Sequence, residues 1–165
     1  MTAPVYYDRF DSPIGPLTIA ADASGLRHVL FAQHCRPARD QASWLLASDA
    51  DVLVQPRRQL LQYLHGQRQH FDLALAPVGT DFQRTVWQAL ARIPFAATWS
   101  YRQLATEIGR PTATRAVGAA NSRNPLPIIL PCHRVVGSNG SLTGFAGGLE
   151  VKQALLALEN AQAPA

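Results

Sequence analysis

A cysteine that stands beside a histidine at the end of an apolar segment is the feature that most constrains this chain. Residues 125–130 (Pro-Leu-Pro-Ile-Ile-Leu) are predicted to form a buried strand or extended segment, and Pro131-Cys132-His133-Arg134-Val135 follows directly. The thiolate is the nucleophilic form of cysteine, and a neighbouring imidazole with a cationic guanidinium favours its formation. Such a pair on its own more often marks a buried structural cysteine, so its meaning depends on the sequence on either side.

Positive charge is concentrated in the second half of the chain. Residues 1–77 contain seven Arg and seven Asp or Glu, whereas residues 78–165 carry the whole formal charge of +4. Between Arg84 and Arg134, seven arginines are opposed by a single acid, Glu107. This distribution is typical of a surface that binds the phosphates of nucleic acid. Charge alone fits a solvated basic face equally well.

The two cysteines lie in different sequence contexts and do not suggest a disulfide framework. A reduced, cytoplasmic setting suits a working thiol such as Cys132. His28, His34 and Cys35 lack the paired spacing of a structural zinc site, so no metal is expected. No apolar run approaches the roughly 18–20 residues of a membrane span. The first residues have neither the basic nor the apolar region of an export signal.

The first half of the chain is predicted to be a small α/β unit. Its predicted elements are an antiparallel β-meander over residues 5–32, helices over residues 37–46 and 52–64, and an edge strand over residues 71–75. The Ala-Pro-Val-Gly sequence at residues 76–79 is the best boundary. We therefore expect two domains, residues 1–77 and residues 78–165.

The second half is predicted to be mainly helical. The predicted helices run from Thr80 or Asp81 to Ile93, from Ser100 as N-cap through Ile108, from Thr112 to Asn121, and from Leu149 to Asn160. Pro94 stops the first of these, and Gly109-Arg110-Pro111 separates the second from the third. Two short helices joined by a glycine-containing turn predict a helix-turn-helix.

The predicted helix over residues 112–121 is built almost entirely from small side chains. Gly118 in its interior costs about 1 kcal/mol relative to alanine. A helix this slim can approach closely either another helix or a nucleic-acid backbone. Arg115, a long cation on an otherwise small surface, favours the nucleic acid.

Four motifs in the second half together resemble one known family. They are Arg-Ala-Val-Gly-Ala-Ala at residues 115–120, Asn-Pro-Leu-Pro at 124–127, Pro-Cys-His-Arg-Val-Val at 131–136, and Gly-Gly-Leu at 147–149. In this order they resemble the O6-alkylguanine-DNA alkyltransferases, also called methylated-DNA–protein-cysteine methyltransferases. The resemblance covers a little over half of the chain, and no single motif carries it.

The resemblance implies an α/β (α+β) fold with a ribonuclease H-like amino-terminal domain and a winged-helix-like carboxy-terminal domain. It implies direct DNA repair, in which an alkyl group moves irreversibly from O6 of guanine in double-stranded DNA to Cys132; O4 of thymine is a further candidate. The damaged base must first flip out of the duplex, because a side chain cannot reach it within the stack. Each chain works once, as a cytoplasmic monomer without cofactor or obligate protein partner.

Five residues receive catalytic roles from the resemblance. Cys132 is the nucleophile and alkyl acceptor, and His133 is the general base, acting through a bound water. Glu159 orients the imidazole; from the residues alone it could equally be an exposed acid at a helix end. Asn124 is the hinge that ties the recognition helix to the active segment, and Tyr101 supplies a proton near guanine N3 as the purine leaves.

The resemblance also assigns the surface that contacts DNA and the pocket for the flipped base. Arg115 enters the duplex in place of the flipped base, and the recognition helix docks in the minor groove. The expected DNA-binding residues are Arg115, Ala116, Gly118, Ala119, Ser122 and Arg123, and the expected pocket residues are Val135, Phe145 and Ala146. Many members have Tyr-Ser where this chain has Phe145-Ala146, so the preferred alkyl group is not predicted.

Two other functions fit parts of the sequence. One is a winged helix that recognises alkylated DNA or regulates transcription, with an inert or redox-sensing Cys132. The other is a cysteine hydrolase that uses Cys132 and His133, although the sequence contains no oxyanion-hole motif. Transfer of a label from alkylated DNA to the protein distinguishes the transferase from both.

Overall fold

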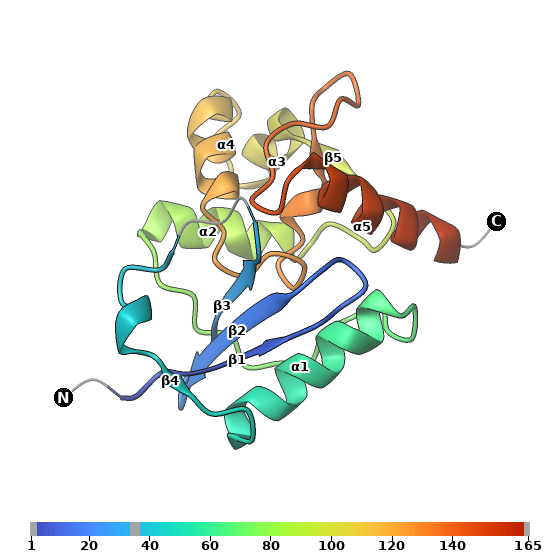
Figure 1. The fold of residues 1–165 in the computed structure, drawn as a ribbon. Helices are drawn as coiled ribbons and strands as arrows, with labels where there is room; N and C mark the ends of the chain where they lie inside the picture. Colours follow the sequence, from blue (N-terminus) through green and yellow to red (C-terminus); the bar gives the residue numbers. More distant parts are fainter. Residues whose placement is uncertain (1–2, 34–36, 164–165) are drawn as a thin grey trace.

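A computed structural model describes residues 3–33 and 37–163 of the chain. A four-stranded sheet with the order β3-β2-β1-β4 forms the amino-terminal half (Figure 1). The strands are β1 (Tyr6–Phe10), β2 (Leu17–Asp22), β3 (Gly25–Phe31) and β4 (Leu45–Leu46). The first three form the predicted antiparallel meander, while β4 pairs with β1 in parallel.

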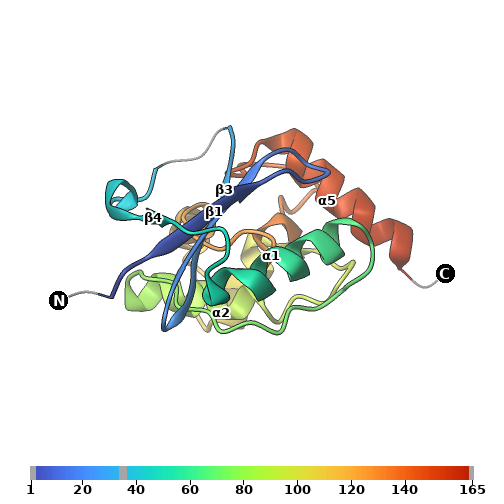
Figure 2. The same ribbon diagram turned by 60° about the horizontal axis from the view of Figure 1, so that its bottom comes forward.

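Helix α1 (Asp51–Leu64) lies along this sheet, as Figures 1 and 2 show. Its buried side chains, among them Leu53 and Leu60, pack in the same core as Leu17 and Ile19 of β2. Helical spacing of its apolar residues predicts this helix correctly.

The helix predicted over residues 37–46 is wrong. The described part of this segment contains a single 3-10 turn, η1 (Gln41–Ser43), followed by β4. The backbone N–H of Leu45 donates to the carbonyl of Val5, 2.9 Å away. Trp44 is buried, with its ring 5.1 Å from His28 and 6.2 Å from Tyr7. Pairing with β1 and burial of this indole therefore override the helical spacing.

The edge strand predicted over residues 71–75 is reduced to an isolated parallel bridge between Leu75 and Leu26. The side chain of Gln59 satisfies the backbone of Asp72 instead of a neighbouring strand. Its Nε2 donates to the Asp72 carbonyl at 3.1 Å, and its Oε1 accepts from the Asp72 N–H at 2.9 Å. A side chain from α1 thus replaces the ladder hydrogen bonds.

The carboxy-terminal half is mainly helical. Its elements are α2 (Asp81–Leu90), β5 (Trp99–Ser100), α3 (Tyr101–Glu107), α4 (Thr114–Ser122), η2 (Cys132–Arg134), β6 (Val135–Val136) and α5 (Leu149–Gln162). Thr80 and Ser100 each form a capping box with the glutamine three residues later, which fixes the starts of α2 and α3. Strands β5 and β6 pair in parallel.

Three predicted helix boundaries shift by two or more residues; one is the end of α5, which lies at Gln162 instead of Asn160. Helix α2 ends at Leu90, because the N–H groups of Arg92 and Ile93 bond three residues back, to Ala89 and Leu90. Helix α4 begins at Thr114, two residues later than predicted.

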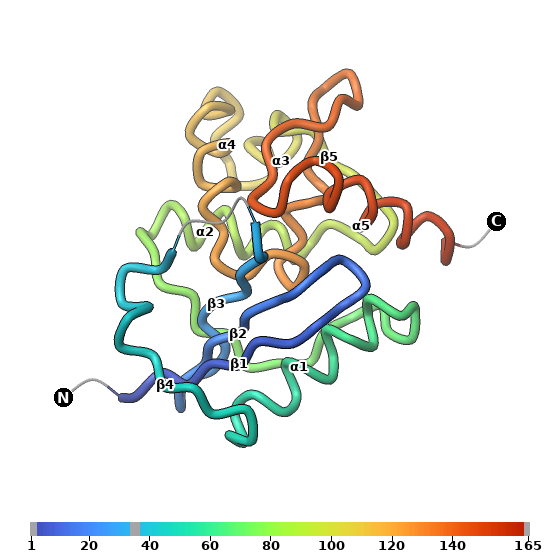
Figure 3. Tube along the Cα trace, in the orientation of Figure 1, coloured from blue at the N-terminus to red at the C-terminus, as the bar shows by residue number. Residues whose placement is uncertain are grey.

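Residues 125–130 form a buried turn, so the predicted strand is wrong. The N–H of Leu130 donates to the Leu126 carbonyl at 2.9 Å, and Ile128 has a φ of 76°. Pro125 and Pro127 lack the N–H that a strand ladder needs. Figure 3 shows this orange segment between the blue sheet and α5; the carbonyl of Pro125 accepts from the N–H of Val29 in β3 at 2.9 Å. The segment before Cys132 is therefore in direct contact with the amino-terminal half.

Candidate active site

Cys132 lies at the start of η2, and its residue is 4% exposed. The following His133 is 0% exposed. The pair lies on a 3-10 turn, η2, which is entered through a hydrogen bond from the Cys132 N–H to the Leu130 carbonyl at 2.7 Å. Both reactive side chains are thus held in a dry interior.

Burial raises the pKa of the Cys132 thiol to about 11; the Asn124 side chain and the Lys152 charge offset part of this effect. The thiol therefore keeps its proton near neutral pH and needs a base before it can act as a nucleophile. The sequence predicts that the Arg134 guanidinium favours the thiolate form of Cys132. In the structure, Arg134 instead pairs with the Glu159 carboxylate.

The imidazole of His133 is the predicted base. Its Nε2 lies 2.9 Å from Oε2 of Glu159. Burial lowers the pKa of His133, although its hydrogen bond to the Glu159 carboxylate opposes this. A neutral ring that donates its Nε2 proton to the carboxylate leaves Nδ1 as the basic nitrogen. Nδ1 is buried and has no hydrogen-bond partner among the described residues.

Glu159 is fully buried near the end of α5, so the alternative of an exposed helix-end acid is wrong. Arg134 donates from Nε to Oε1 at 2.9 Å and from Nη2 to Oε2 at 2.8 Å, and the Ala96 N–H donates to Oε1 at 3.2 Å. The hydroxyl of Tyr63 also donates to Oε2. Burial alone would raise the pKa of this carboxyl, but hydrogen bonds from His133 and Arg134 lower it to about 2.

Asn124 connects the end of α4 with the segment that leads to Cys132. Its Nδ2 donates to the Leu130 carbonyl at 2.8 Å, and its Oδ1 accepts from the Leu126 N–H at 3.0 Å. These two hydrogen bonds fix the Asn124 amide to the segment before Cys132, and its role as a hinge stays a prediction.

Tyr101, the first residue of α3, lies between α4 and the loop that precedes α5. Its hydroxyl is 3.0 Å from Oγ1 of Thr143. A Cβ added to Gly118 would lie 3.7 Å from the Tyr101 ring, in ordinary contact. Thus Gly118 places the α4 backbone next to this tyrosine.

Helix α4 exposes its small residues and its arginine. The exposed residues on and just after the helix include Arg115, Ala116, Ala119, Ser122 and Arg123, whereas Gly118 is half-buried. The opposite face packs inward through Val117 and Ala120, and the indole N–H of Trp87 donates to the Ala120 carbonyl at 2.9 Å. Internal packing therefore explains the inner face of α4 but not its exposed alanines.

A hollow of about 420 Å³ lies beside Asn124 and contains Phe145 and Ala146 in its wall. Ser122 and Arg123 at the end of α4 also line it, so it opens near the predicted DNA-binding surface. Val135 is fully buried in β6 and does not line this hollow. Its carbonyl instead accepts a hydrogen bond from Lys152.

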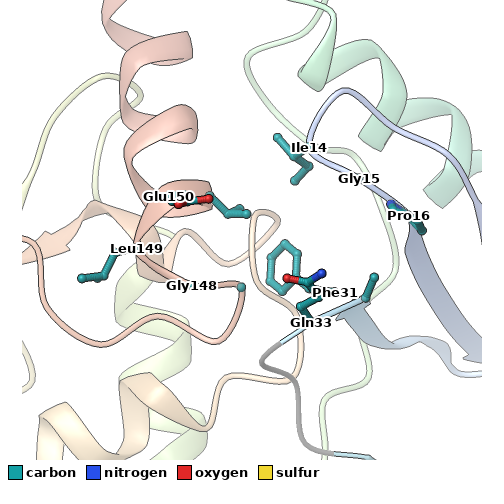
Figure 4. A pocket seen from close by; sticks show the side chains of 11 residues that line it. Ile14, Gly15, Pro16, Phe31, Gln33, Gly148, Leu149 and Glu150 are labelled. Atoms are coloured by element: carbon teal, nitrogen blue, oxygen red, sulfur yellow. The ribbon is translucent and has the colours of Figure 1, made fainter.

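A larger hollow, of about 570 Å³, lies between the β1–β2 turn and the start of α5 (Figure 4). Figure 4 shows Ile14 and Pro16 on one side, Leu149 and Glu150 on the other, and Phe31 between them. Its wall contains no cysteine, histidine or basic side chain. Cys132 lines neither hollow, but Asn124, whose side chain lies near the Cys132 thiol, lines the smaller one.

Neither Tyr63 nor Lys152 is among the site residues predicted from the sequence. Tyr63 has the spacing of a core aromatic on α1, and no local pattern distinguishes it. The spacing of Lys152 does indicate burial, because Lys152, Leu155 and Glu159 share the buried face of α5. Two charged residues on an apolar helix face indicate buried polar contacts.

In comparison with known proteins, both halves of the chain match domains of the same family. The family described as "6-O-methylguanine DNA methyltransferase, DNA binding domain" matches residues 81–161, and its "ribonuclease-like domain" matches residues 5–77. A methylated-DNA–protein-cysteine methyltransferase of Methanosarcina barkeri is 48% identical over 94% of this chain and 97% of its own.

Solved structures agree with the sequence relatives. A crystal structure of Mycobacterium tuberculosis O6-methylguanine methyltransferase has a TM-score of 0.88 and 45% identity, covering 98% of this chain and 96% of its own. That of Mycobacterium tuberculosis OGT in complex with DNA has a TM-score of 0.87 and 46% identity, covering 96% and 95%. The predicted α/β fold class and the resemblance are confirmed; the boundary at residues 76–79 stays a prediction.

Two further expectations concern metals and membranes. Within residues 3–33 and 37–163, no group of three or more His, Cys, Asp or Glu side chains could hold a metal ion. The candidate ligands His34 and Cys35 lie outside the described residues. Across the same described ranges, no helix combines the length and apolar character needed to cross a bilayer.

Proposed function

The chain belongs to the methylated-DNA–protein-cysteine methyltransferase family, and we propose that Cys132 is the residue to which it transfers an alkyl group from O6 of guanine in DNA. The observation that carries this assignment is that the buried Cys132 directly precedes a buried His133. The Nε2 of His133 pairs with Glu159, and its Nδ1 has no hydrogen-bond partner among the described residues. A thiol with a raised pKa needs such a base.

The reaction is a displacement at the alkyl carbon. His133 takes the proton of the Cys132 thiol at Nδ1, through a bridging water, and Glu159 stabilises the imidazolium that results. The sulfur forms a bond to the alkyl carbon while the bond from that carbon to O6 breaks, and its electron pair stays on guanine. Tyr101 gives a proton to guanine N3, so the purine leaves neutral.

The product on the protein is a thioether, which has no easy leaving group. No second step returns the cysteine, and the chain therefore works once. Unmodified guanine is restored in the DNA, so the repair is direct.

The exposed face of α4 is the DNA-binding surface in this proposal. Its alanines let the backbone approach the groove closely, and Arg115 occupies the gap left by the flipped base. The base enters the hollow beside Asn124, where Phe145 and Ala146 contact it. O4 of alkylated thymine is a second candidate substrate for the same hollow.

The remaining expectations follow from this chemistry. Acceptor and base both belong to the chain, so we propose a monomer that acts without a cofactor. Because a working thiol must stay reduced, we also propose a cytoplasmic location.

The test is incubation of the protein with excess duplex DNA that contains O6-methylguanine. Product should rise as a burst and stop at no more than one methyl group per chain, with the mass of one CH₂ added to the peptide that contains Cys132. Cys132→Ala should lose transfer but still bind the alkylated duplex. Methylation of Cys35 would reassign the acceptor, product in several-fold excess over protein would indicate a hydrolase, and binding without transfer would indicate a recognition module.

A further inference from the structure

Tyr63 extends from α1, in the amino-terminal half, into the site formed by the carboxy-terminal half. Its residue is 1% exposed. The ring packs near two phenylalanines, with centroid distances of 5.3 Å to Phe71 and 6.5 Å to Phe95. Phe95 in turn packs against the guanidinium of Arg134, 5.6 Å from its ring centroid. Aromatic contacts therefore hold the tyrosine in one orientation, and Phe95 connects them to the Arg134–Glu159 ion pair.

The hydroxyl of Tyr63 contacts both members of the relay behind Cys132. It donates to Oε2 of Glu159 and lies 3.5 Å from Nε2 of His133. Burial and the Glu159 charge raise the pKa of Tyr63 well above its usual range. The phenol consequently keeps its proton and acts as a donor to the ionised carboxylate.

Tyr63 and His133 compete for the same carboxylate oxygen. Oε2 accepts from Tyr63 and from Arg134 and is 2.9 Å from Nε2 of His133. Each added donor stabilises the negative charge on Glu159. It thereby weakens the interaction of that charge with a protonated His133 imidazole. The phenol should therefore keep His133 less basic than Glu159 alone would make it.

We propose that Tyr63 is a positioning residue for alkyl transfer, which fixes the Glu159 carboxylate and limits the basicity of His133 from the amino-terminal half of the chain. This inference rests on the proposed function, in which His133 is the base. Through the hydrogen bond from Tyr63 to Glu159, the amino-terminal half of the chain takes part in the reaction. The simpler alternative is a core tyrosine whose hydroxyl only needs a partner.

The test compares the pH dependence of single-turnover transfer in the wild type and in Tyr63→Phe. Without the phenol, Glu159 favours the imidazolium, so the pKa of His133 rises and the acidic limb of the rate profile moves to higher pH. We expect a shift of about one pH unit, and hence about tenfold slower transfer on that limb. An NMR titration of the His133 ring in both proteins should show the same displacement.

Tyr7→Phe is the matched control, because the hydroxyl of Tyr7, on β1, makes no hydrogen bond to any other described residue. Its profile should overlay that of the wild type. A second variant keeps the hydroxyl: 3-fluorotyrosine at position 63 is a more acidic donor and should move the limb to lower pH. Opposite shifts from the two substitutions are not expected of a purely structural tyrosine.

The outcomes separate the inference from the proposed function. If the wild type transfers but neither Tyr63 variant shifts the acidic limb or the His133 titration, the positioning role is overturned. If Tyr63→Phe does not fold, the fluorinated variant decides alone. Absence of transfer by the wild type would instead overturn the proposed function.

Discussion

The guanidinium of Arg134 contacts both carboxylate oxygens of Glu159, from Nε at 2.9 Å and from Nη2 at 2.8 Å. Its third nitrogen donates to the Ile93 carbonyl at 2.7 Å. The pair joins the turn that contains Cys132 to the last helix, and both side chains are buried. Arg134, two residues after Cys132, thus acts on the carboxylate that pairs with His133.

We predict that Glu159→Gln destabilises the fold as well as slowing transfer. The substitution leaves the Arg134 charge buried without its ionic partner, which typically costs about 3–5 kcal/mol. Urea unfolding at neutral pH measures this loss. Glu150→Gln, on the exposed start of the same helix, is the control and should change the free energy of unfolding by less than about 0.5 kcal/mol. Equal losses in the two variants would contradict a stabilising role for the buried pair.

Acid should destabilise the protein in two stages. The folded pKa of His133 is lowered from 6.5, so below that pH the unfolded chain binds a proton that the folded chain does not. The pKa of Glu159 is lowered from 4.5 to about 2, so its contribution is present above pH 4.5 and is lost as the pH falls toward 2. The free energy of unfolding should therefore decrease from pH 6.5 downward and again below pH 4.5. A series of urea titrations between pH 8 and pH 3 tests this, and a flat profile would contradict it.

The local elements of this chain could be predicted from its sequence where capping and periodicity agree. Thr80 and Ser100 each precede a glutamine at the third helical position, and both start helices as predicted. The segment around Trp44 has helical spacing too, but the sheet uses its backbone and buries its indole. Tertiary pairing of this kind leaves no trace in a local pattern.

The candidate site was predictable only in part for the same reason. Motifs at Cys132, Asn124 and Arg115 indicate a family, and the site residues follow by resemblance. Tyr63 comes from a helix whose pattern is that of an ordinary core. Its contact with Glu159 depends on how the two halves pack, which no local spacing encodes.

Arg115→Ala should slow transfer more on a fully paired duplex than on single-stranded or mismatched substrate. Arg115 is exposed on α4, and in the proposed complex it compensates for the stacking lost when the base flips. Unpaired substrate has less stacking to lose, so the variant should be closer to the wild type there. Single-turnover rates on the three substrates measure the difference.

The control is Arg58→Ala, which removes the same charge from an exposed position on α1, away from α4 in Figure 1. It should weaken binding only slightly and evenly, with a change in salt dependence. An equal loss on all substrates for Arg115→Ala would leave this arginine a role in phosphate attraction alone.

Lys152 is the only lysine of the chain, which makes its burial testable by chemistry. Its Nζ donates to the Val135 carbonyl at 2.6 Å and to the Thr143 carbonyl at 2.8 Å, and the residue is 0% exposed. An amine-selective reagent should reach Lys152 only when the chain is unfolded. Peptide mapping of the two samples checks this. Rapid labelling of Lys152 in the native state would show that the loop carrying Thr143 opens readily.

Methylation of Cys132 should make the protein less stable than the free thiol form. Residue Cys132 is 4% exposed, with the Asn124 side chain near its thiol, so an added methyl group has little free space. Overpacking of this kind typically costs about 1–3 kcal/mol. Thermal unfolding of the protein before and after one turnover, with the repaired DNA removed, should show a lower midpoint for the methylated form. Protein exposed to undamaged duplex and purified in the same way is the control, and equal midpoints would mean that the site accommodates the methyl group without repacking.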